Sequence, residues 1–253
     1  MRWTRSRAAL VGGNPLPWVI LALTTVSGML DAISFLGLGK VFIGMMTGNV
    51  IVLGFAFGGV PGYSEPGPLI AIVCFVTGIV LAGRGARLAA LRGQQPWFLW
   101  ALLTETGLLF AATAVAWLVP DSSPAVRDGI TALLSTAMGV RCATIRRLAV
   151  PDLVVTFGLT GALIALVQDS GTACGCRRDD STCPQGRHTT APQQVARRLG
   201  VVLALGAGAA LGAALMDNAG LRWSLLVVTV SVGVITGVVQ VRQGVRKALP
   251  AAG

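Results

Sequence analysis

Charged residues are scarce in this sequence: 12% of its 253 residues are Asp, Glu, Lys or Arg, whereas 54% are hydrophobic. A soluble globular domain carries roughly 25% charged residues. The chain therefore has too little charge to cover a water-facing surface, and its mean hydropathy of +0.74 agrees. This composition excludes a soluble enzyme and indicates an integral membrane protein.

Acidic residues are scarcer still, with 10 against 20 Lys and Arg, so the formal net charge is +10. A nucleic-acid-binding protein needs a basic face on a soluble fold. Here the cations instead flank apolar blocks, where membrane proteins place them against anionic headgroups and as topology signals. We therefore expect the lipid bilayer as the surroundings and no nucleic-acid partner. The clusters are Arg2, Arg5, Arg7; Arg84, Arg87, Arg92; Arg146, Arg147; and Arg242, Arg246, Lys247.

Groups for enzyme chemistry are nearly absent. The single histidine, His188, lies in a polar segment, so no Ser/His/Asp arrangement can form within the apolar blocks. No phosphate-binding Gly-x-x-x-x-Gly-Lys-Ser/Thr motif occurs, and the glycines of 206–215 follow no strand pattern. We predict that the chain is not an enzyme and binds no cofactor.

Three of the five cysteines, Cys174, Cys176 and Cys183, share the polar segment with His188. Thiols and an imidazole could surround zinc, but the spacing fits no common zinc pattern. A disulfide pair is the alternative if this segment faces an oxidising compartment. A polar loop without a metal is the preferred interpretation.

Long apolar runs dominate the chain, and about 20 such residues suffice for a helix that crosses a bilayer. We predict an all-α membrane protein, a bundle of six to eight transmembrane helices. The second, fifth and sixth blocks contain many glycines or charges and are candidates for re-entrant or broken helices. The positive-inside rule conflicts with eight crossings, and an odd count resolves the conflict if the second block does not cross fully. The blocks are about 17–38, 41–60, 68–90, 97–119, 126–149, 151–168, 199–216 and 221–241.

Two parts of the sequence look alike. Thr47-Gly48-Asn49 compares with Thr160-Gly161-Ala162, and 28–32 compares with 139–143, at spacings of 113 and 111 residues. Transporters are often built from two such repeats around a central site. We expect two related halves. The predicted organisation is a basic tail 1–16, a first half 17–120, a second half 121–241 with a polar loop 169–198, and a basic tail 242–253.

The segment 28–54 contains a Gly-x-x-Asp-Ala-x-Ser-Phe motif followed by Phe and then Met-Thr-Gly-Asn. This pattern resembles the signature of the YoaK family of bacterial membrane proteins. The resemblance implies a polytopic bacterial membrane protein without an established substrate. The polar segment 169–198 looks longer than the family's usual connection. The matching residues are Gly28, Asp31, Ala32, Ser34, Phe35, Phe42, Met46, Thr47, Gly48 and Asn49.

Asp31 lies within an apolar block, where a charge costs at least about 2.5–3.5 kcal/mol. Ser27, Asp31 and Ser34 share one helix face, which should point into the bundle. These residues could form a proton, cation or substrate site. Alternatively, Asp31 makes an interhelical hydrogen bond or pairs with Arg141.

Further polar residues lie inside other blocks. Thr47 and Asn49 flank Gly48, which serves either tight helix packing or a binding site. Thr156 and Thr160 are the expected counterparts in the second half. Glu105 is a functional candidate by default, unless it lies shallow enough to reach the headgroups.

We expect this chain to transport a small solute or an ion across the bacterial cytoplasmic (inner) membrane as a multi-pass, proton-coupled permease. The alternative is a scaffold, sensor or assembly partner that transports nothing. A transporter needs a water-accessible cavity around Asp31, whereas a scaffold packs the same residues dry.

Overall fold

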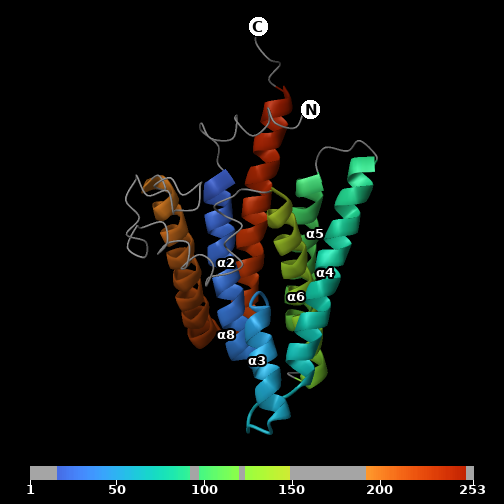
Figure 1. The fold of residues 1–253 in the computed structure, drawn as a ribbon, viewed down its shortest axis with the longest axis vertical. Helices are drawn as coiled ribbons and strands as arrows, with labels where there is room; N and C mark the ends of the chain where they lie inside the picture. The colour runs from blue at the N-terminus through green and yellow to red at the C-terminus, as the bar shows by residue number, and fades with distance from the viewer. Residues whose placement is uncertain (1–15, 92–96, 120–122, 149–191, 249–253) are drawn as a thin grey trace, which may run out of the picture.

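The computed structural model describes residues 16–91, 97–119, 123–148 and 192–248. Within these ranges the regular structure is entirely helical, which confirms the predicted all-α membrane protein (Figure 1). Apolar stretches long enough to cross a membrane lie in α2, α4, α5 and α8. The elements are α2 (Leu16–Gly37), α3 (Met46–Phe57), α4 (Pro66–Leu91), α5 (Trp97–Leu118), α6 (Pro124–Leu148) and α8 (Pro192–Ala248).

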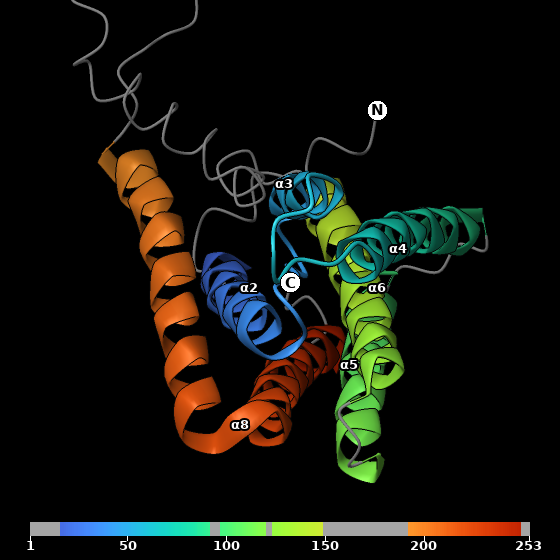
Figure 2. The same ribbon diagram turned by 90° about the horizontal axis from the view of Figure 1, so that it is seen from below.

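Helix α8 consists of two arms joined at Gly220, whose φ of 75° and ψ of 178° are not helical. Glycine adopts such angles without the steric cost that a Cβ atom brings. The chain reverses there, so that the arms form a V around α2 (Figure 2). With these two arms, the described part of the chain has six long helical segments, the lower limit of the predicted range. Helix α8 also begins at Pro192, inside the polar loop that was predicted to extend to residue 198.

Helix α3 is too short to cross the membrane. Its 12 residues rise about 18 Å, whereas the hydrocarbon core is about 30 Å thick. A turn with positive φ at Gly39 (94°) and Lys40 (63°) ends α2, and residues 38–45 are not helical. The second apolar block is therefore a broken segment, as its weak pattern indicated, rather than a full crossing.

Glycines let neighbouring helices touch through their backbones. A Cβ atom on Gly28 of α2 would collide with the carbonyl oxygen of Leu205 in α8, and one on Gly208 with that of Thr25. Helices α4 and α6 repeat the arrangement: Gly139 lies against the carbonyl of Phe75, and Gly78 against that of Thr136. These contacts fit the small-residue packing of membrane helices.

The two ends of the bundle differ in charge. At one end α2 and α8 begin, while α4, α6 and the second arm of α8 end (Figure 1). We call this the basic end, because the described helices have nine cationic positions there and no acidic one. The nine are Arg84, Arg87, Arg146, Arg147, Arg197, Arg198, Arg242, Arg246 and Lys247. At the opposite end Lys40, Arg127 and Arg222 are balanced by Glu65, Asp128 and Asp217.

Candidate functional site

An ion pair lies inside the bundle between α5 and α6. Arg141 Nε donates to Glu105 Oε1 at 2.5 Å, and Nη2 of the same guanidinium is also paired with that oxygen. Both residues are buried, with exposed fractions of 2% for Arg141 and 1% for Glu105. Glu105 therefore does not reach the headgroups, the alternative that the sequence left open.

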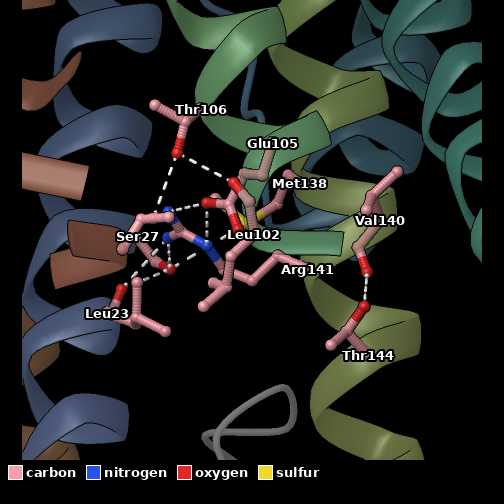
Figure 3. A network of polar contacts seen from close by, with 10 residues as sticks. Leu23, Ser27, Leu102, Glu105, Thr106, Met138, Val140, Arg141 and Thr144 are labelled. Atoms are coloured by element: carbon pink, nitrogen blue, oxygen red, sulfur yellow. Dashed lines mark hydrogen bonds and ion pairs between the residues drawn. The ribbon is translucent and has the colours of Figure 1, made fainter. Parts of the chain in front are cut away.

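Arg141 also reaches the neighbouring helix α2. Its Nη1 donates to the carbonyl oxygen of Leu23 at 3.1 Å and to Ser27 Oγ at 2.9 Å (Figure 3). The Ser27 hydroxyl in turn donates to the Leu23 carbonyl at 2.9 Å. One guanidinium thus connects three helices, and its direct carboxylate partner is Glu105 instead of the alternative, Asp31.

Asp31 holds the broken segment in place. Its Oδ1 accepts the backbone N–H groups of Ile43 at 2.8 Å and Gly44 at 2.7 Å, just before α3 begins. The carboxylate satisfies N–H groups that lack a helical partner, and a negative charge is favourable at a helix N-terminus. Ser34 is buried and donates to the Asp31 carbonyl at 3.0 Å, so it supports the backbone and not the carboxylate.

Asn49 fixes the same segment from the other side. Its Oδ1 accepts Phe42 N–H at 2.8 Å, and its Nδ2 donates to Phe42 C=O at 2.6 Å. The Phe42 ring stacks on Phe35 with centroids 4.8 Å apart. It also lies against Gly48, where a Cβ atom would come within 2.7 Å of the ring. The Asp-Ala and Thr-Gly-Asn motifs therefore meet at this non-helical segment.

Of the remaining candidates, the structure describes Thr47 alone. Thr47 is exposed, on the opposite face of α3 from buried Asn49. Thr156, Thr160 and the polar segment with its cysteines lie outside the described residues. Among the described residues, no group of three His, Cys, Asp or Glu side chains could hold a metal ion.

The sequence indicated Arg141 only as a possible partner of Asp31, whereas in the structure its guanidinium is at the centre of the polar contacts between α2, α5 and α6. Opposite charges in two apolar blocks, Glu105 in one and Arg141 in another, were the available signal. A hydroxyl pair was missed altogether: Thr113 Oγ1 of α5 and Thr229 Oγ1 of α8 lie 2.7 Å apart. Carbonyls across the interface are also within reach of these hydroxyls, with Leu225 O 3.4 Å from Thr113 Oγ1 and Leu109 O 3.3 Å from Thr229 Oγ1.

The buried charges of the described bundle do not balance. Asp31, Glu105 and Arg141 are its charged residues with buried side chains, so there are two carboxylates for one guanidinium. Glu105 has the direct contact with the guanidinium, whereas Asp31 is held by backbone N–H groups. Transferring an unpaired charge out of water is costly. A proton on one carboxylate would make the group neutral.

A family model described as "Protein of unknown function (DUF1275)" matches residues 19–238. The chain belongs to this family. The match confirms the resemblance based on 28–54 and extends it from α2 through most of α8. The chain is also similar to the "UPF0700 transmembrane protein YoaK" of Bacillus subtilis (strain 168), to which it is 29% identical over 159 residues. The alignment covers 59% of this chain and 64% of the relative, less than two thirds of its length. No solved structure matches the chain.

Proposed function

We propose that this protein is a proton-coupled permease for a small solute in the bacterial cytoplasmic membrane. The observation that carries the proposal is the buried group of Asp31, Glu105 and Arg141 between α2, α5 and α6. Ionisable residues inside a membrane are costly and usually mark ion, proton or substrate paths. The surplus carboxylate supports proton coupling, and Asp31 is the proton carrier because it has no direct contact with the guanidinium.

The proposal includes two halves of inverted topology. Equivalent positions make equivalent contacts: Thr25 and Gly28 correspond to Thr136 and Gly139, since 136 − 25 and 139 − 28 both equal 111. Their partners on α8 and α4 also keep one spacing, since 205 − 75 and 208 − 78 both equal 130. Helix α2 runs away from the basic end and α6 toward it (Figure 1). Inverted repeats around a broken helix are typical of secondary transporters.

Two cavities of the described bundle, one between α4 and α5 and one near Gly220, are not lined by Asp31, Glu105 or Arg141. In a permease this arrangement corresponds to an occluded conformation, and movement of one half against the other opens the group to water. The same proposal includes a multi-pass chain, the lipid bilayer as its surroundings, no nucleic-acid partner and no enzymatic activity.

The test is coupled flux in proteoliposomes that contain the pH dye pyranine. Pools of organic acids, amines, amino acids and sugars are added outside, and the internal pH is followed. We expect one pool to shift the internal pH with the wild type and not with Asp31→Asn. Asparagine keeps the oxygen that accepts the Ile43 and Gly44 N–H groups, so the fold should survive while the proton site is lost.

Glu65→Gln is the matched control, because Glu65 is exposed outside the bundle. It should transport like the wild type. The proposal fails if no pool moves protons, or if Asp31→Asn moves them as fast as the wild type.

A scaffold or assembly role is the second candidate, and two observations favour it. Neither cavity reaches Asp31, as expected of a scaffold that packs these residues dry. Asp31 and Asn49 also bond to backbone groups of their own segment. In that case Asp31→Asn changes only the melting temperature, and solutes leave the internal pH unaffected.

A further inference from the structure

A cavity of about 420 Å³ opens between α4 and α5 over a floor made by α6. We call it the α4–α5 groove. Its walls are mainly aliphatic or small, with Leu81, Gly85 and Leu88 on α4 and Ala101 and Leu108 on α5. The groove does not belong to the Asp31, Glu105 and Arg141 group. A ligand in this groove would therefore be independent of the proposed transport activity.

The polar groups in the groove leave its surface apolar. The hydroxyls of Thr104, Thr136 and Thr144 donate to carbonyls one turn earlier in their own helices, at 2.7–2.8 Å. Arg147 is the charged residue among the lining side chains, and its Nη2 donates to the carbonyl of Gly83 at 3.2 Å. A guanidinium has five N–H donors, so this contact uses a small part of its capacity.

The groove lies where headgroups and acyl chains meet. Helix α4 is uncharged from Pro66 to Gly83, 18 residues or about 27 Å of helix, and Arg84 and Arg87 come next. That length nearly spans the hydrocarbon, so residues beyond Gly83 reach the interface. Trp100, 60% exposed, lines the groove at this level, as expected for an interfacial aromatic residue.

The groove also faces outward. Helix α4 leans away from the bundle toward its C-terminal end, so α4 and α5 diverge there (Figures 1 and 2). The exposed side chains at this edge, Leu81, Leu88 and Trp100, are 54–60% accessible. The occupant therefore needs an apolar part for the walls and an anionic part for Arg147.

We propose that the α4–α5 groove binds an anionic phospholipid, with an acyl chain along the walls and the phosphate at Arg147. The charge of the basic end favours an anionic over a zwitterionic headgroup, since nine cationic positions and no acidic one occur there among the described helices. Basic pockets between transmembrane helices are known to select anionic headgroups.

Native mass spectrometry of the purified full-length protein tests this with equal amounts of phosphatidylglycerol and phosphatidylcholine. We expect the wild type to retain phosphatidylglycerol preferentially. Arg147→Gln should lower that preference about fivefold, because one cation contributes about 1 kcal/mol of attraction to anionic lipid. Gly85→Leu should reduce retention of both lipids, because a Cβ there meets open space and the side chain would fill the groove.

Matched controls exist for both variants. Arg222→Gln removes a cation at the opposite end, and Gly107→Leu adds the same side chain to α5 at a position with open space outside the groove. Both should bind lipid like the wild type, and melting curves verify that all variants are folded. Equal retention of the two lipids by the wild type, or an unchanged preference in Arg147→Gln, overturns the proposal. A dimer that excludes lipid and dissociates in Gly85→Leu also overturns it, in favour of a second copy.

Discussion

The side chain of Arg141 is 2% exposed, and its guanidinium joins α6 to both α5 and α2. Burying a charge is tolerable only when it is paired and hydrogen-bonded. Glu105 supplies the opposite charge, while Ser27 and the Leu23 carbonyl bind the remaining edge. Each partner lies on a different helix from Arg141, so the pair also fixes how α2, α5 and α6 sit relative to one another.

The first prediction concerns this pair. Glu105→Leu leaves the guanidinium buried without a counter-charge, which should cost about 3–5 kcal/mol of stability. The double variant Glu105→Leu/Arg141→Leu should recover most of that loss, because two apolar side chains of similar size need no pairing. Thermal unfolding in detergent measures both. If the double variant is as unstable as Glu105→Leu, the ion pair is not the cause.

Close contacts at glycines determine which helices pack against each other. The carbonyl of Leu205 lies against Gly28, and that of Phe75 against Gly139, so the α2–α8 and α6–α4 pairs are held by backbone contact. In lipid no hydrophobic effect drives helices together, so such packing supplies much of the association energy.

The second prediction rests on these contacts. Gly28→Ala and Gly139→Ala each place a Cβ atom onto a carbonyl oxygen of the partner helix, and overpacking typically costs about 1–3 kcal/mol. Gly107→Ala is the control, because a Cβ there has nothing within 4 Å. It should be neutral or slightly stabilising, since alanine favours helix over glycine by about 1 kcal/mol. Melting temperatures that fall equally in all three variants would contradict the packing argument.

The elements could largely be predicted from the sequence, because α2, α4, α5 and α8 are apolar over a membrane's width. The break before α3 was less certain, since a Gly-rich apolar block fits either a crossing or a re-entrant segment. The partners of the polar residues could not be deduced. Asp31 binds the segment before α3, while Glu105 pairs with Arg141, and both outcomes depend on where the chain turns at Gly39 and on the rotation of α5 against α6.

The unequal charge of the two ends of the bundle implies an orientation of the protein in the membrane. Cytoplasmic loops of membrane proteins carry an excess of Lys and Arg. The conflict with eight crossings does not arise in the described helices, because α3 does not cross and α6 ends where α8 begins, so the basic positions of α4, α6 and α8 lie at one end (Figure 1). The six long segments of the described chain are thus an even count, and not the odd count that the sequence suggested. The last prediction is therefore that the basic end faces the cytoplasm.

Two reporter fusions measure this orientation. Green fluorescent protein after residue 248, at the end of α8, should fluoresce because it stays in the cytoplasm. Alkaline phosphatase inserted after Tyr63, between α3 and α4, should be active because it is exported.

The two fusion points lie at opposite ends of the bundle, since α4 begins at one end and the second arm of α8 finishes at the other (Figure 1). The reporters must therefore fall on opposite sides of the membrane. An active phosphatase with a dark fluorescent protein would put both points outside and contradict the fold itself. An inactive phosphatase with a dark fluorescent protein would keep the fold but place the basic end outside, against the positive-inside rule.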